Sequence, residues 1–273
     1  MTTMNMPQFC EIDVSGRPLR IEYRWIGSAQ PDAPVLVFLH EGLGSVAIWR
    51  DWPEAVCTLT GCRGLLYSRP GYGRSTPRAP DEKWPIDYLH DQAHRVLPAV
   101  LAALGVDTAR QPPFLYGHSD GGSIALLYAA AFPDRAAGIA VAAPHIFVED
   151  VTIKNLAIAR DAYLTTGLRD RLARYHDDVD SAFWGWNDAW LNPEFRHWNI
   201  EAELDAITCD VVAMQGVNDE YGTLEQIRGI ARRVPQTRLV EIDDCAHTPH
   251  KDKPDMVAAE IAALMQRGNF HTA

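Results

Sequence analysis

The stretch Phe114-Leu-Tyr-Gly-His-Ser-Asp-Gly-Gly122 decides the fold class of this chain. Its first three residues are apolar and predict the end of a buried strand, and the run of small and apolar residues at 124–131 predicts a helix directly afterwards. Between them stands G-x-S-x-G, with Ser119 at its centre. A serine on so sharp a strand-to-helix turn needs glycine neighbours, because larger side chains would collide. The pattern predicts a nucleophile raised above the edge of a sheet.

Outward from this turn, short apolar runs alternate with longer helical patterns. An antiparallel hairpin is predicted from 11–14 and 21–25, followed by buried strands at 35–39, 64–67, 113–116, 137–142, 211–214 and 238–242. Helices are predicted at 46–59, 88–104, 122–131, 224–233 and 254–266. This alternation is typical of an α/β protein in which helices cover a parallel sheet.

The region 145–206 departs from that alternation, because it has helical patterns (154–165, 168–175 and 181–191) and no convincing strand. We predict a helical cap at 145–206, inserted into a core made of 1–144 and 207–273. Half of the chain's 8 tryptophans lie in this cap. Three of them, Trp184, Trp186 and Trp190, are candidate substrate-pocket residues, although rings that only attach a cap to its core would give the same pattern.

Composition and charge narrow the classes of partner. With 273 residues, 47% of them hydrophobic and 22% charged, the chain has ordinary globular usage. Its net charge of −11 would repel a phosphate polymer, which excludes nucleic acid as a partner. No apolar run reaches the roughly 18 residues of a membrane span, and residues 1–10 lack the pattern of a secretory signal. We expect a small-molecule substrate and a monomer or homodimer.

The cysteines point to the compartment. There are five, an odd number, and none form a CxxC pair, which argues against a disulfide framework and a thiolate metal site. We therefore expect a cytoplasmic protein with reduced thiols.

Serine at neutral pH needs a base, which in turn needs an acid to orient it. In this fold class the chain order is serine, acid, histidine. Asp219 follows the strand pattern at 211–214, and His247 follows the one at 238–242. Both side chains would emerge at the carboxyl edge of the sheet beside Ser119. We predict that His247 moves the proton and that Asp219 orients the imidazole.

Rival residues lie close by in the sequence. Glu220, Asp243 and Asp244 compete with Asp219, and His250 competes with His247. His118 is expected to be a packing residue that points away from the reacting centre. Five other histidines show no ligand-like spacing and are expected to be structural or surface groups: His90, His94, His145, His176 and His197.

An acyl-transfer enzyme also needs donors for the oxyanion. One is expected to be the backbone N–H of Asp120, the residue after the nucleophile. The second is expected from the glycine-containing loop His40-Glu-Gly-Leu-Gly-Ser45, where backbone amides can approach a ligand closely.

These features together make the chain resemble the α/β-hydrolase superfamily with an inserted cap. The resemblance covers nearly the whole chain. Its motifs are the loop at 40–44, Arg69-Pro-Gly-Tyr-Gly-Arg-Ser75, the Ser119 turn, Asp219 and His247. The resemblance implies a mostly parallel, eight-stranded sheet flanked by helices, no cofactor and no metal, with a structural role for the turn at 71–75.

The chain departs from the family's pattern at two positions. Many members have His-Gly where this chain has His40-Glu41, so alignment by His40 makes Gly42 the second oxyanion donor. We place His40 and Glu41 among the candidate pocket residues, with a surface position for Glu41 as the alternative. The other departure is Asp120, whose carboxylate would oppose an oxyanion. We expect it to be turned away or neutralised, for example by Arg69 or Arg74.

The identity of the nucleophile selects the reaction. Family members that displace halide or open epoxides use aspartate, so Ser119 favours hydrolysis of a carboxylic ester. The aromatic cap favours a largely apolar acyl or alcohol group. C–C bond hydrolysis of an anionic ring-cleavage product stays open and would need a basic anchor, for which Arg160 and Arg169 are available in the cap. Lactone or thioester hydrolysis, aminopeptidase activity and acyl transfer also stay open. A different class is a ligand receptor that keeps the fold with a silent triad.

Overall fold

The computed structural model describes residues 7–268, which form one eight-stranded sheet in the order β1-β2-β4-β3-β5-β6-β7-β8. The strands are β1 (Gln8–Val14), β2 (Arg17–Gly27), β3 (Val35–Leu39), β4 (Arg63–Tyr67), β5 (Phe114–His118), β6 (Gly138–Ala142), β7 (Asp210–Gly216) and β8 (Thr237–Ile242). The pairs β1–β2 and β2–β4 are antiparallel and all other pairs are parallel. The predicted α/β-hydrolase fold is confirmed.

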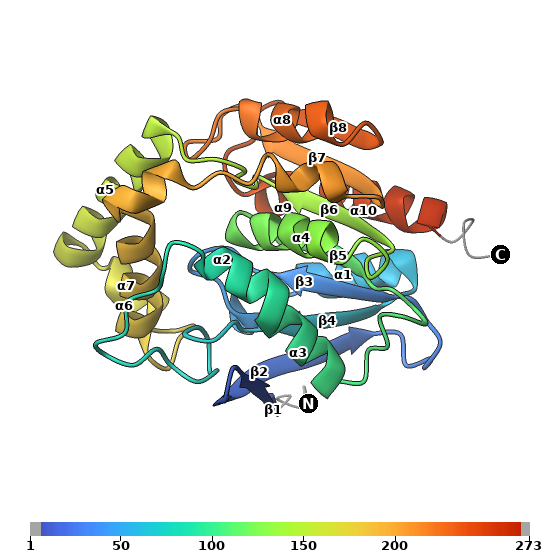
Figure 1. Ribbon diagram of the computed structural model, residues 1–273, viewed down its shortest axis with the longest axis horizontal. Helices are drawn as coiled ribbons and strands as arrows, with labels where there is room; N and C mark the ends of the chain where they lie inside the picture. Colours follow the sequence, from blue (N-terminus) through green and yellow to red (C-terminus); the bar gives the residue numbers. More distant parts are fainter. Residues whose placement is uncertain (1–6, 269–273) are drawn as a thin grey trace.

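Helices cover both faces of this sheet (Figure 1). One face packs against α2 (Tyr88–Asp91), α3 (Leu97–Ala103), α4 (Asp120–Ala131) and α8 (Glu225–Arg233), and the other against α1 (Trp52–Thr60), α9 (Pro249–Asp252) and α10 (Pro254–Gly268). Alternate residues of β3 show the split: Val37 belongs to the first layer of core and Phe38 to the second. Because both faces are covered, the central strands read as continuous apolar runs.

Two predicted helices are interrupted. The pattern at 46–59 divides into the 3-10 turn η1 (Val46–Trp49) and α1, separated by Arg50 with φ 54°. Pro53 lies in the first turn of α1, where its missing N–H costs no hydrogen bond. The pattern at 88–104 contains a π-helical turn, η2 (Gln92–Val96), between α2 and α3. Pro98, which has no N–H to continue the helical ladder, follows that turn.

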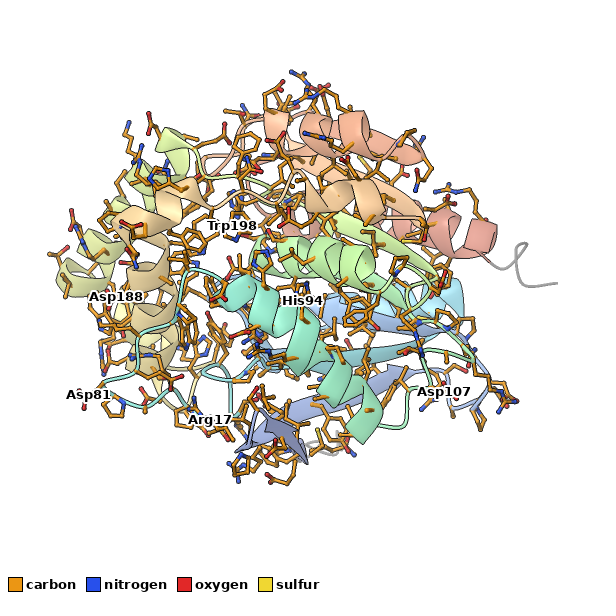
Figure 2. The ribbon with its side chains drawn as sticks, viewed as in Figure 1. Arg17, Asp81, His94, Asp107, Asp188 and Trp198 are labelled. Atoms are coloured by element: carbon orange, nitrogen blue, oxygen red, sulfur yellow. The ribbon has the colours of Figure 1, made fainter. Side chains whose placement is uncertain are left out.

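The regular elements between β6 and β7 are helices joined by loops, and one isolated bridge pairs Phe147 with Asn199. It contains α5 (Asp150–Thr165), α6 (Leu168–Leu172), α7 (Val179–Trp190) and the 3-10 turns η3 (Pro193–His197) and η4 (Glu203–Ala206). In Figure 1, α5, α6 and α7 lie at one end of the molecule. Figure 2 marks that end by Asp188 of α7, opposite Asp107, which precedes β5. The division into a cap at 145–206 and a core stays a prediction.

Within residues 7–268, no helix has the length and apolar character needed to cross a membrane. The first six residues of the stretch 1–10, on which we based the absence of a secretory signal, lie outside the described residues. All five cysteines are described and have free thiols.

Candidate active site

Ser119 occupies the turn between β5 and α4, with φ 52° and ψ −119°. A non-glycine residue with positive φ is strained, and strain of this kind is concentrated at functional sites. The glycines on either side make the turn possible. A Cβ on Gly117 would lie 2.1 Å from the carbonyl oxygen of Gly121, and one on Gly121 would lie 2.0 Å from that of Leu39. The sequence motif is therefore set by close backbone approach.

The structure brings Ser119, His247 and Asp219 together. His247 Nε2 lies 3.0 Å from Ser119 Oγ, and His247 Nδ1 lies 2.8 Å from Asp219 Oδ1. A carboxylate can only accept, so Nδ1 carries the hydrogen and Nε2 is left to accept from the serine hydroxyl. The three residues come from the loops after β5, β7 and β8, which end at the same edge of the sheet.

Asp219 is held as an anion. Its Oδ1 also accepts the Tyr221 backbone N–H at 2.8 Å, and its Oδ2 accepts from Gln215 Nε2 at 3.0 Å. Burial alone would raise the pKa of this carboxyl, but its hydrogen bond with His247 and the charge of that ring lower the pKa below its usual value. The carboxylate can therefore stabilise an imidazolium at neutral pH.

The rival residues have other partners. Glu220 accepts the backbone N–H of His247 at 3.2 Å and does not bond the ring. His250 Nδ1 lies 3.2 Å from the hydroxyl of Tyr116. His118, expected to pack away from the reacting centre, has its Nε2 2.7 Å from the carbonyl oxygen of His247.

Asp120 is buried and fully engaged. Its Oδ2 accepts from the Tyr88 hydroxyl at 2.9 Å and lies 3.4 Å from Arg69 Nη2, and its Oδ1 accepts from Trp190 Nε1 at 3.2 Å. Burial raises the pKa of Asp120, and the charge of Arg69 opposes that rise. Of the two expected partners, Arg69 is the one that neutralises the Asp120 carboxylate. Arg74 pairs with a different carboxylate, because its Nε lies 3.9 Å from Asp177 Oδ1.

Two backbone amides near Ser119 have no acceptor in residues 7–268. Asp120 is the first residue of α4, so its N–H has no carbonyl to bond within the helix. Gly42 lies in the loop after β3, and its N–H also makes no hydrogen bond to the described chain. Free donors at the N-terminus of a helix and in a glycine loop suit a developing negative charge.

A cavity of about 220 Å³ opens beside Ser119. It is lined mainly by apolar side chains from the loop after β3 and from the helices between β6 and β7: Glu41, Gly42, Leu43, Ile48, Ser119, Asp120, His145, Thr152, Leu156, Leu172, Trp186, Trp190, Tyr221 and His247. Three of the candidate pocket residues, Trp186, Trp190 and Glu41, line this cavity, and their contact with a substrate stays a prediction.

The other two candidate pocket residues, Trp184 and His40, do not line this cavity. Trp184 packs on Tyr163 and Phe183 and lines a different hollow. It stands two residues from Trp186, which at about 100° per residue puts it on the opposite side of α7. His40 is completely buried, with Nε2 accepting the Arg69 backbone N–H at 3.0 Å and Nδ1 2.7 Å from the Glu41 carbonyl oxygen.

Glu41 places a charged carboxylate at the cavity. Burial opposes its ionisation, but the nearby His118 and Lys251 hold the pKa of Glu41 well below its usual range. The distance from Glu41 Oε2 to His118 Nδ1 is 3.7 Å, longer than a hydrogen bond.

His145 and Tyr221 line the cavity although sequence reasoning did not select them. His145 is buried, and burial together with the charge of His247 lowers its pKa to about 3, so it is neutral at pH 7. The ring of Tyr221 lies 4.7 Å from that of His247. Their positions just after β6 and β7, at the same edge as Ser119, were the available signal.

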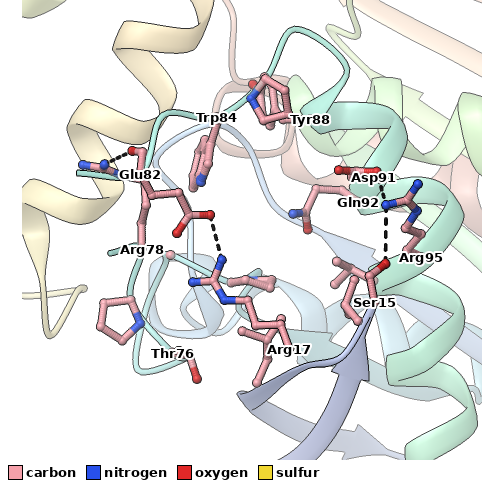
Figure 3. A pocket seen from close by; sticks show the side chains of 17 residues that line it. Ser15, Arg17, Thr76, Arg78, Glu82, Trp84, Tyr88, Asp91, Gln92 and Arg95 are labelled. Carbon is pink, nitrogen blue, oxygen red and sulfur yellow. Dashed lines mark hydrogen bonds and ion pairs between the residues drawn. The ribbon is translucent and has the colours of Figure 1, made fainter. Parts of the chain in front are cut away.

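A second cavity, also of about 220 Å³, lies between the β1–β2 hairpin and the chain from Pro70 to Val96 (Figure 3). Four of its charged side chains form two ion pairs, Arg17 with Glu82 at 2.7 Å and Arg95 with Asp91 at 3.4 Å, and the guanidinium of Arg78 donates to backbone carbonyl oxygens. In residues 7–268 no group of three or more His, Cys, Asp or Glu side chains is arranged to hold a metal ion.

Comparison with known proteins places this geometry in a family. The model of the alpha/beta hydrolase family matches residues 36–260. The chain belongs to the alpha/beta hydrolase family. Among curated relatives of this hydrolase is the sn-1-specific diacylglycerol lipase ABHD11 of Mus musculus, which is 24% identical over 283 residues, covering 90% of this chain and 87% of the relative.

Solved structures similar to this hydrolase are named for different activities. A proline iminopeptidase of Mycobacterium smegmatis has a TM-score of 0.75 at 17% identity, covering 97% of this chain and 100% of that one. The enol-lactonase of Burkholderia xenovorans LB400 has a TM-score of 0.72 at 21% identity (94% and 99%). A thermophilic esterase of Thermogutta terrifontis has a TM-score of 0.70 at 18% identity (96% and 99%). These likenesses show the fold.

Proposed function

We propose that this hydrolase cleaves carboxylic esters of small, largely apolar molecules through an acyl-enzyme on Ser119. The observation that carries the proposal is the position of His247, whose ring lies 3.0 Å from Ser119 Oγ on one side and 2.8 Å from Asp219 Oδ1 on the other. An imidazole held in that tautomer can take the serine proton as the hydroxyl attacks.

The chemistry follows from the groups at the site. Ser119 Oγ attacks the ester carbonyl while His247 Nε2 takes its proton, and the amides of Gly42 and Asp120 stabilise the oxyanion. His247 then returns the proton to the leaving alcohol, which departs and leaves the acyl group on Ser119. Water, deprotonated by the same nitrogen, then attacks the acyl-enzyme carbonyl. The bond to Ser119 Oγ breaks, His247 returns the proton to that oxygen, and the carboxylic acid leaves.

The lining of the cavity supports a neutral acyl group. None of the described residues that line it is a lysine or an arginine. Arg160 lines the separate hollow that Trp184 also lines. Arg169 Nη2 lies 2.5 Å from Asp180 Oδ2. An anionic ring-cleavage product would therefore lack a basic anchor here, which favours ester hydrolysis over C–C bond hydrolysis. The diacylglycerol lipase named above also acts on an ester, as its name states.

The test is hydrolysis of short p-nitrophenyl esters by the wild type and by Ser119→Ala. Loss of the nucleophile is expected to lower kcat by at least about 10³-fold. Ser15→Ala is the matched control, because Ser15 lines the cavity of Figure 3. Equal activity of the wild type and Ser119→Ala would refute the proposal. A folded wild type that hydrolyses no ester, lactone or thioester but binds a ligand would instead indicate a receptor.

A further inference from the structure

The carbonyl oxygen of Glu41 is an unusually crowded acceptor. It accepts the backbone N–H of Gly44 at 3.1 Å and Arg69 Nη2 at 2.9 Å, and it lies 2.7 Å from His40 Nδ1. Two of these three donors are buried side chains with 0–1% exposure. A carbonyl oxygen has two lone pairs, so three partners hold it firmly in one orientation.

That orientation also determines where the N–H of Gly42 points. The carbonyl of Glu41 and the N–H of Gly42 belong to one peptide unit, which is planar, and in a trans peptide the two bonds point in opposite directions. Groups that hold the carbonyl on the Arg69 side therefore direct the Gly42 N–H to the opposite side. Gly42 lines the cavity beside Ser119.

Arg69 also bonds to the other oxyanion donor residue. Its Nη1 and Nη2 lie 3.5 and 3.4 Å from Asp120 Oδ2. The backbone N–H of Asp120 is the free amide at the start of α4, and its carboxylate is further held by Tyr88 and Trp190. One planar guanidinium thus connects the two segments that supply the donors, and its fork shape suits such a double contact.

The backbone of Arg69 completes the arrangement. Its N–H donates to His40 Nε2 at 3.0 Å, which means that His40 carries its hydrogen on Nδ1 and donates it to the Glu41 carbonyl. Burial lowers the pKa of His40 well below its usual value, so this neutral tautomer persists.

We propose that Arg69 is a positioning residue that sets the direction of both oxyanion donors, the amides of Gly42 and Asp120. This inference depends on the proposed ester hydrolysis. It assigns to Arg69 an effect on the transition state, where the negative charge exists, and little effect on binding of the uncharged ester. Replacement of Arg69 is therefore expected to lower kcat much more than it raises KM.

The experiment compares Arg69→Lys and Arg69→Met with the wild type on a p-nitrophenyl ester. Lysine keeps a positive charge near Asp120 but cannot bond Asp120 and the Glu41 carbonyl with one planar group. Because methionine leaves the Asp120 charge buried without its partner, Arg69→Lys serves as the second variant if Arg69→Met does not fold. Cooperative unfolding is checked for each variant, and rates are normalised to the folded fraction.

The deciding readout is the affinity for a trifluoromethyl ketone, which adds to the serine and forms an oxyanion. We expect kcat to fall about 10- to 100-fold, somewhat less than for complete loss of a donor, and the ketone to bind more weakly by a similar factor, with KM within about threefold of wild type. Arg74→Met is the matched control, because Arg74 belongs to the same loop and is solvent-exposed. It should change none of these values.

The outcomes separate the two proposals. A folded Arg69→Lys with wild-type kcat and ketone affinity overturns the positioning role, and so does a change confined to KM. Even when the positioning role is overturned, the proposed function stands if Ser119→Ala is inactive in the same assay. If Ser119→Ala retains activity, the proposed function itself fails.

Discussion

The two cavities of about 220 Å³ differ in chemistry although their volumes agree. In the cavity of Figure 3, Arg17 and Arg95 already have carboxylate partners from the cavity's own lining. Beside Ser119, two backbone amides have no acceptor in the described chain, and a serine hydroxyl faces an imidazole. Volume therefore does not distinguish a reactive site from a surface hollow. The distinguishing property is the presence of polar groups that the protein leaves available to a substrate.

The largest expected difference between the cavities is catalytic. His247→Ala removes the base and is expected to lower kcat by at least about 10³-fold, which corresponds to about 4 kcal/mol of transition-state stabilisation. Gln92→Ala in the cavity of Figure 3 should leave kcat unchanged. The measurement is kcat of both variants on one ester. A comparable loss of kcat in both variants would contradict the conclusion that only the cavity beside Ser119 is catalytic.

The next effect is on the pH dependence of stability. Because the pKa of His145 is about 3 in the folded protein and about 6.5 when unfolded, the unfolded chain binds a proton that the folded chain excludes. The contribution of His145 to stability is therefore present above about pH 6.5 and is lost as the pH falls towards 3. When the pH falls from 7 to 5, the free energy of unfolding of His145→Gln is expected to decrease by about 2 kcal/mol less than that of the wild type. Denaturant unfolding at the two pH values measures this, and identical losses would show that His145 is not held neutral.

A smaller effect is expected on acyl length. Leu172 lies on α6 and lines the cavity beside Ser119. Leu172→Phe is expected to lower kcat/KM about tenfold for a p-nitrophenyl hexanoate and to change the acetate little, because a larger ring occupies space that only the longer chain needs. Val96→Phe, a similar enlargement in the cavity of Figure 3, is the control. Equal losses for both esters would place the acyl group elsewhere.

The smallest effect concerns the ion pair of the second cavity. Arg17 is about half exposed, and exposed ion pairs contribute little. Arg17→Ala is expected to lower the free energy of unfolding by less than about 1 kcal/mol and to leave ester hydrolysis unchanged. Chemical denaturation together with the ester assay tests both statements. A loss of activity would mean that this hollow communicates with Ser119.

Much of the fold could be predicted, because its signals are local. The apolar runs of the central strands and the glycines around Ser119 reflect contacts within a few residues or burial on both faces of a sheet. The breaks at Arg50 and within 88–104 were harder to predict, since each depends on how a helix start or a π-turn fits against its neighbours. Prolines at 53 and 98 were the local hints.

The pocket could be predicted only in part. Trp186 and Trp190 are four residues apart and share one side of α7, whereas Trp184 lies on the other. The periodicity of the helix was readable, but which side faces the cavity was not. His40 illustrates the same difficulty. Its Nδ1 bonds the carbonyl oxygen of the neighbouring Glu41, but its Nε2 accepts the backbone N–H of Arg69, which lies far along the chain.

The sequence by itself determined the sheet, the turn at Ser119 and the order in which nucleophile, acid and base follow one another, because strand burial and turn sterics are written in neighbouring residues. Only the tertiary structure decided that Asp219 rather than Glu220 bonds the imidazole ring of His247, and that Asp120 is neutralised by Arg69. Those choices depend on distances between segments that lie far apart along the chain, and such distances arise only when the packed core sets how each loop and helix is oriented.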